Sequence, residues 1–129
     1  MKKLLLTDGG ETFEVWLKIS CYRNGNLKIT LLFWNEDFRD IWTFVTADSG
    51  MLLCGKDCAY IDTYTNGQEI LDWLVKNKLA TPMRRADSFG GCTYPIYQFN
   101  SKMLKHLDPE GYADYINGWK QWNMLKKDK

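Results

Sequence analysis

The sequence predicts an α+β fold: an antiparallel β-meander of four to five strands with two main helices packed on the sheet. Three observations lead to this prediction. The first half of the chain alternates apolar and polar residues with a period of two, as a strand with one buried face does. Short turn sequences separate the alternating segments, which favours antiparallel pairing of consecutive strands. After residue 64 the apolar period becomes helical, and strands followed by helices are typical of α+β domains.

Four strands are expected before residue 62. They cover about residues 12–22, 27–33, 40–47 and 51–61. In the first strand Phe13, Val15 and Leu17 fall on one side, and Asn24-Gly25-Asn26 supplies the residues of a hairpin turn. A fifth strand is expected from Thr93 to Phe99, at a sheet edge because Pro95 lacks a backbone donor.

Three helical segments follow from periodicity and capping residues. The first covers residues 67–79, and Thr65 with Gln68, or Asn66 with Glu69, matches a capping box at its start. The second is short, from Ser101 to Leu107. The third begins at Asp108-Pro109-Glu110, where an N-cap residue precedes a first-turn proline and an acid.

Composition and charge exclude several classes of protein. The 129 residues suit one domain, 1–129, and 45% apolar with 26% charged residues is globular rather than disordered. A formal charge of +1 argues against a strongly basic nucleic-acid binder and against an acidic mimic of DNA. We find no secretory signal and no apolar run long enough to span a membrane, so we expect a cytoplasmic protein with reduced cysteines.

The cysteines raise two hypotheses, and neither is favoured. Cys54 and Cys58, completed by Cys92 and His106, could form a zinc site, but C-x3-C lacks a paired second half, so we expect no metal and no cofactor. Cys92 after Gly90-Gly91 could be a nucleophile with His106 as its base. A lone histidine in a helix is more often a surface residue, so no catalytic residue is assigned.

The segment after residue 83 could bind an anion. Cations, a hydroxyl and glycine amides fall close together there, which are groups that hold phosphate or carboxylate. They are Arg84, Arg85, Ser88, Gly90 and Gly91. The alternative is a solvated loop whose glycines serve positive φ.

An aromatic face is the most informative candidate surface. Strand parity places Trp16, Trp34 and Trp42 together on the side that should be wet and polar. The favoured interpretation is that the terminal helix covers this face. The covering residues would be Tyr112, Tyr115, Ile116 and Trp119. Otherwise the face is exposed and binds a partner or a second copy of the chain.

The middle of the chain resembles a known family. The segments are Ala59-Tyr60-Ile61-Asp62-Thr63, the helix with Trp73-Leu74, and Ser88 to Tyr97, within roughly residues 55–100. They are similar to a family of small uncharacterised bacterial proteins, a domain of unknown function often carried on mobile elements of gut bacteria. The resemblance implies an accessory role in a mobile element and transfers no catalytic residue.

Three functions remain open. The favoured one is a non-enzymatic module that binds a protein partner or forms a homodimer, with no membrane association. The second is a nucleic-acid-binding module that stacks bases on the sheet aromatics. Its phosphate contacts would be Arg84, Arg85, Lys102 and Lys105. The least supported is a cysteine-dependent enzyme that uses Cys92.

Overall fold

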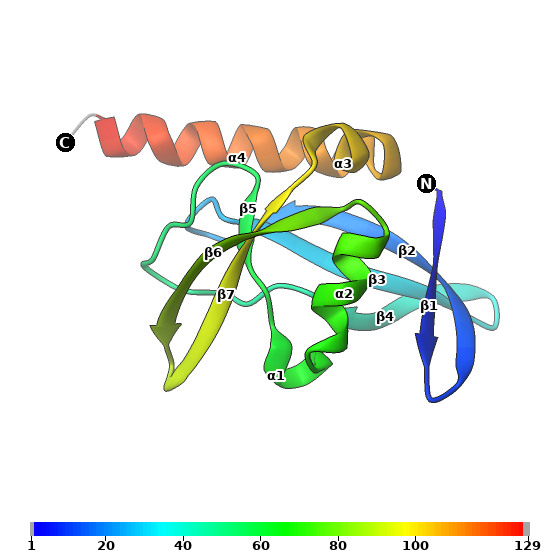
Figure 1. The fold of residues 1–129 in the computed structure, drawn as a ribbon. Helices are drawn as coiled ribbons and strands as arrows, with labels where there is room; N and C mark the ends of the chain where they lie inside the picture. The colour runs from blue at the N-terminus through cyan, green and yellow to red at the C-terminus, as the bar shows by residue number, and fades with distance from the viewer. Residues whose placement is uncertain (1, 128–129) are drawn as a thin grey trace.

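A computed structural model describes residues 2–127, and the α+β prediction is confirmed. The described chain forms two antiparallel sheets and four helices (Figure 1). The strands are β1 (Lys3–Asp8), β2 (Glu11–Cys21), β3 (Leu27–Asn35), β4 (Phe38–Phe44), β5 (Cys58–Tyr60), β6 (Ala80–Phe89) and β7 (Cys92–Phe99). The helices are α1 (Thr63–Asn66), α2 (Glu69–Lys76), α3 (Ser101–Leu107) and α4 (Pro109–Lys127).

The first sheet is a meander in the order β1-β2-β3-β4. Its first hairpin pairs Leu6 with Phe13 and turns at Gly9 and Gly10, whose φ angles of 59° and 84° need glycine. The sequence analysis did not predict β1. Three successive leucines hide the period of two there, although Leu4 and Leu6 pack on the core.

The second sheet, in the order β5-β7-β6, corrects two expectations. The predicted fourth strand supplies only Cys58–Tyr60, which pairs with β7, and the segment meets the chain after β4 in a single antiparallel bridge between Thr46 and Ile61. The predicted edge strand β7 lies in the middle. The backbone of Pro95 faces β5, and its carbonyl accepts from Ile61 N at 3.0 Å. Because β5 ends at Tyr60, the ladder needs no N–H donor from Pro95, and a proline is tolerated there.

The predicted helix after residue 66 is present, but the predicted capping box at its start is not. Residues 69–76 form α2, but its N-cap Gln68 makes no side-chain cap. Instead Asp62 caps the separate helix α1 through Thr65 N at 3.0 Å. Asn66 donates from its side chain to Phe44 O at 2.9 Å and so joins α1 to the end of β4.

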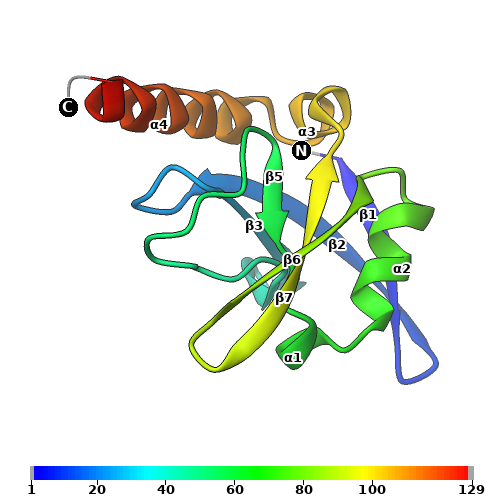
Figure 2. The same ribbon diagram turned by 60° about the vertical axis from the view of Figure 1, so that its left-hand side comes forward.

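Helix α4 packs along β2, and Asp108 fixes the contact. One carboxylate oxygen accepts from Ile19 N at 2.9 Å and the other from Gly111 N at 3.1 Å. Ile19 lies three residues beyond Trp16, the last β2 residue that pairs with β1, so its N–H lies on a free edge of the sheet. The same buried carboxylate therefore caps the start of α4 and satisfies an N–H on the free edge of β2. Helices α3 and α4 lie together on one side of the sheet (Figures 1 and 2).

A second junction ties α4 to the other sheet. Tyr112 donates to Asp57 Oδ1 at 2.8 Å, and Tyr115 Oη accepts from Asp57 N at 2.7 Å. Asp57 also accepts, through its carbonyl, from Phe99 N of β7 at 2.7 Å. Burial and the hydrogen bond to Asp57 raise the pKa of Tyr112, and burial raises that of Tyr115, so both phenols stay neutral.

The main core fills the space between the meander, α2, α3 and α4. Its strand residues are Val15, Leu17, Ile19, Leu27, Ile29 and Leu31, all of them buried. Leu74 of α2, Leu104 of α3 and Tyr115 of α4 pack against them. The inner face of the first sheet is therefore the one that the helices and the second sheet cover.

Candidate functional site

The outer face of the meander is not covered by α4, which corrects the favoured sequence interpretation. Tyr112 and Tyr115 belong to the main core, and Ile116 and Trp119 pack on that core at its border. Gly118 lies against Cys21, a residue of the inward-facing register. The terminal helix was expected to cover the aromatic residues of the outer face, but α4 packs against the inner side and the free edge of β2 instead.

Trp42 does not lie on the outer face, and a β-bulge is the reason. Leu31 pairs with Thr43 and Leu32 with Ile41, so β4 has one extra residue at Trp42. One extra residue reverses the side on which the following side chains point. The Trp42 ring therefore lies inside, with its centroid 4.9 Å from that of Phe13.

Trp16 and Trp34 lie together on the outer face, as strand parity predicted. Their rings meet edge-on with centroids 6.1 Å apart. We call this surface the open face and define it by the outward register of β1 to β4. Its large apolar residues are Leu5, Trp16, Leu32, Trp34, Ile41 and Phe44, and its cations are Lys3, Lys18, Lys28 and Arg39.

The apolar side chains of the open face are accessible. Trp34 is 53% exposed, Ile41 48% and Phe44 44%, and Leu5 extends the strip onto β1 at 57%. The neighbours Trp16 and Leu32 are partly buried beneath them. Exposed apolar side chains on one continuous face commonly mark an interaction site.

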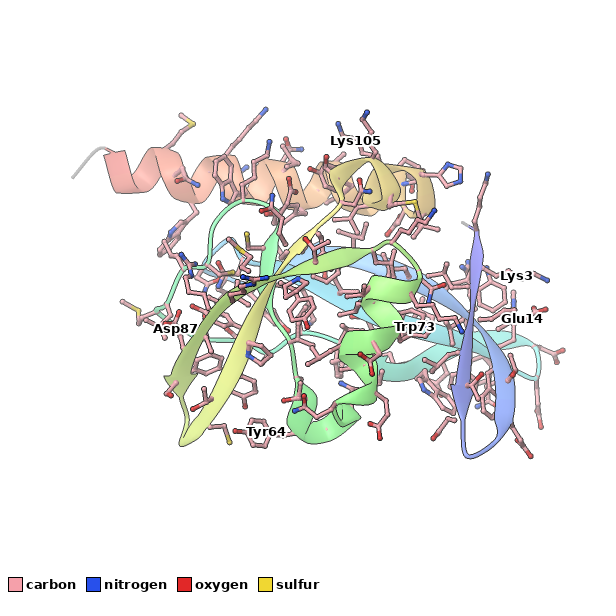
Figure 3. The ribbon with its side chains drawn as sticks, in the orientation of Figure 1. Lys3, Glu14, Tyr64, Trp73, Asp87 and Lys105 are labelled. Carbon is pink, nitrogen blue, oxygen red and sulfur yellow. The ribbon has the colours of Figure 1, made fainter. Side chains whose placement is uncertain are left out.

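Cations lie beside these rings, a feature that the sequence analysis did not single out. Arg39 lies over Trp34, with Cζ 5.7 Å from the ring centroid, and Lys28 Nζ lies 5.2 Å from that of Phe44. Lys3 pairs with Glu14 at 2.8 Å, and Figure 3 shows the two side by side on the β1–β2 hairpin. The signal was present in the sequence, because the period of two already placed lysines of β2 and β3 on the side of Trp16.

The residues predicted to bind an anion are spread along the β6–β7 hairpin. Arg84 and Arg85 lie within β6, and Arg84 adopts a φ of 57° at an irregularity of the ladder. Ser88 bonds Thr93 across the two strands at 2.7 Å, next to the turn formed by Gly90 and Gly91. The structure therefore does not gather these residues into one loop, and anion binding stays a prediction.

Arg85 lies at a small cavity. It donates to Cys54 O at 3.4 Å and lines a space of about 350 Å³ between the 53–55 loop and α4. Trp119 and Trp122 form the helix side of that space. Arg84 and Arg85 lie on β6, and Lys102 and Lys105 lie on α3, so these four cations come from other elements than the open face.

The structure buries Cys54 and Cys58 and does not bring Cys92 and His106 together. Cys54 and Cys58 are buried, and burial, with the neighbouring Cys58, raises the pKa of the Cys54 thiol to about 12. Cys92 begins β7 and His106 lies in α3 beyond its other end, so roughly 23 Å of strand separates them. Among residues 2–127, no three His, Cys, Asp or Glu side chains are grouped to hold a metal ion.

A groove of about 1040 Å³ lies between the β1–β2 hairpin and the α1–α2 segment. Two pairs of its polar groups bond to each other: Trp73 Nε1 donates to Leu5 O at 2.7 Å, and Thr43 Oγ1 donates to Asn66 Oδ1 at 2.6 Å. Trp73 can be located on α2 in Figure 3. A specific small-molecule site needs convergent polar groups that are free to bind, so the open face is the stronger candidate.

Comparison with known protein families assigns the chain to one of them. The model of a family described as a domain of unknown function, DUF4313, matches residues 16–119, which is more than half of the chain. The chain belongs to the DUF4313 family. The match extends from Trp16 in β2 to Trp119 in α4, so the matched region includes both sheets except β1 and the first five residues of β2.

Two further comparisons give no match, neither with curated proteins nor with solved structures. Within residues 2–127 of the chain, no helix has the length and apolar character needed to cross a membrane.

Proposed function

We propose that this DUF4313 domain is a non-enzymatic binding module that holds a macromolecular partner on its open face. The carrying observation is the exposed strip formed by Trp34, Ile41 and Phe44. Burying such a side chain is worth about 1.5–3 kcal/mol, so a partner that covers the strip gains substantially. The separation of Cys92 from His106 supports a role in binding rather than in cysteine chemistry.

The composition of the open face fits a recognition surface. Tryptophan and arginine are over-represented among the residues that dominate binding energy in interfaces, and here Arg39 lies over Trp34. The sequence favoured a protein partner or a second copy of the chain, and the experiment below identifies the partner class. A cytoplasmic accessory role in a mobile element belongs to the same proposal, and the four free cysteines are compatible with a reducing compartment.

Site-specific photocrosslinking tests this proposal. The full chain is produced in its native host with p-benzoylphenylalanine in place of Trp34, or in place of Val75 of α2 as the control. Val75 is similarly exposed but lies away from the open face. We expect a discrete adduct from position 34 that is absent from position 75 and weakened by Arg39→Ser.

The adduct is then digested with protease or with nuclease, and its mass is compared with that of two chains. These measurements separate a protein partner, a nucleic acid and a homodimer. The same adducts from both positions, or none from position 34, would show that the open face is not the binding surface.

A further inference from the structure

We infer that the partner held by the open face is single-stranded nucleic acid, an inference that rests on the proposed function of that face. The argument has three parts: the charge of the face, the position of its aromatic rings, and the pairing of cations with rings. Each part concerns side chains that the strand register brings to one surface.

Positive charge is concentrated on this face of a chain that is nearly neutral overall. Seventeen basic and sixteen acidic residues give the whole chain a formal charge of +1. The outward register of β1 to β4 nevertheless carries four cations, whereas the one carboxylate among these described strand residues is Glu14. Glu14 is itself paired with Lys3. The surplus favours a polyanion over a partner of mixed charge.

The aromatic rings provide flat surfaces on which unpaired bases can stack. Phe44 lies opposite Thr30, and Trp34 lies four residues further along β3, roughly 13 Å away. Trp16 touches Trp34 from the neighbouring strand. An open face with ring platforms at this spacing can contact several successive bases of one strand. In a duplex those bases are stacked inside and out of reach.

Cations beside the rings complete the arrangement. Arg39 lies over the ring of Trp34 and Lys28 over that of Phe44. A base that takes the place of the cation on either ring leaves that positive charge close to its own phosphate. Lys18 on β2 lies opposite Thr30, which faces Phe44 on its other side. Alternation of aromatic and basic groups is what sequence-tolerant binding of single strands requires, because every base has a π-face and every nucleotide has a phosphate.

Fluorescence anisotropy with labelled 12-nucleotide oligomers tests the inference on the purified full chain. The probes are oligo-dT, oligo-U and a blunt hairpin duplex with the same number of phosphates, with poly-glutamate as a competitor. We expect binding of either single strand at 50 mM salt, weaker binding of the duplex, and no competition by poly-glutamate. A preference for oligo-U would assign RNA, and equal or stronger binding of oligo-dT would assign single strands of either kind.

Matched variants link binding to the open face. Trp34→Ser and Phe44→Ser should each weaken binding roughly fivefold or more, the low end of one lost stacking contact. Arg39→Ser should lower the slope of log affinity against log salt by about 0.7, the contribution of one phosphate contact. Lys105→Ser is the control, because Lys105 also lies over a ring, that of Tyr112, but on α3 (Figure 3).

Several results would overturn the inference. They are no binding at 50 mM salt, equal affinity for the duplex, effective competition by poly-glutamate, and equal losses in the Lys105 and Arg39 variants. Failure here remains distinguishable from failure of the proposed function. A protease-sensitive photoadduct from position 34 with no oligonucleotide binding would keep the open face as the site and exclude nucleic acid as its partner.

Discussion

Replacing Asp108 by alanine should destabilise the domain more than any other single loss of a carboxylate on α4. Its two oxygens accept from Gly111 N and from Ile19 N, and the residue is 8% exposed. Loss of an N-cap costs about 0.5–2 kcal/mol. A buried N–H left without an acceptor costs about 1–3 kcal/mol. We therefore expect Asp108→Ala to lower the free energy of unfolding by about 2–4 kcal/mol.

A second substitution separates the two contributions. Asparagine caps helices about as well as aspartate but has one acceptor oxygen, so Asp108→Asn should keep the bond to Gly111 and lose the one to Ile19. Its cost should therefore be about 1–3 kcal/mol. Asp114→Ala is the matched control, because Asp114 is exposed on the same helix and should change stability by less than about 0.5 kcal/mol.

Urea unfolding followed by circular dichroism measures these differences, with an unchanged slope as evidence that the unfolded state is the same. If Asp108→Ala and Asp114→Ala unfold at the same urea concentration, the reasoning is refuted, since the carboxylate then neither caps α4 nor closes the edge of β2.

Three further predictions concern packing and pH. Gly118→Ala should be less favourable in the native chain than in Cys21→Ala, because its Cβ would lie 2.5 Å from Cys21 Sγ and force that side chain to move, and a double-mutant cycle measures the difference. Trp42→Ala should cost about 2–3 kcal/mol and Trp34→Ala less than about 1 kcal/mol, because the first ring is packed on the core and the second lies on the open face. Equal costs in urea unfolding would contradict the effect of the bulge. Burial raises the pKa of Tyr112, so the stability it contributes is full below the unfolded-state pKa near 10 and is lost as the pH rises above it. The free energy of unfolding from urea curves at pH 8, 10 and 11 should therefore fall more steeply in the native chain than in Tyr112→Phe, by at most about 1.4 kcal/mol per pH unit; parallel declines would exclude this role.

Much of the fold could be predicted because its strands and helices follow simple periods. The alternation at Val15 and Leu17 and the proline at position 109 both predicted real elements. The segment from Ala80 to Phe89 could not be predicted, because Thr81-Pro82 resembled a helix end and the polar residues after it resembled a turn. Its partner strand β7 holds it in the sheet, and that tertiary constraint is invisible to a local pattern.

The open face was predictable in part. Parity placed Trp16 and Trp34 correctly because no irregularity separates them along the β2–β3 ladder. It failed at Trp42, since a bulge adds one residue without leaving a mark in the sequence. The prediction that the terminal helix covers the aromatic face was also wrong. An apolar stripe on a helix shows that the helix packs, but it does not show which face of a sheet receives it.

The two bonding partners of α4 have a consequence for synthesis. Ile19 and Asp57 both bond to groups that follow them in the chain by more than fifty residues. Ile19 bonds to the carboxylate of Asp108, and Asp57 bonds to the phenols of Tyr112 and Tyr115. On a ribosome the meander emerges first, with the edge of β2 unprotected until α4 leaves the exit tunnel. The chain thus completes its core late, and we expect the nascent meander to depend on chaperones or rapid translation during that interval.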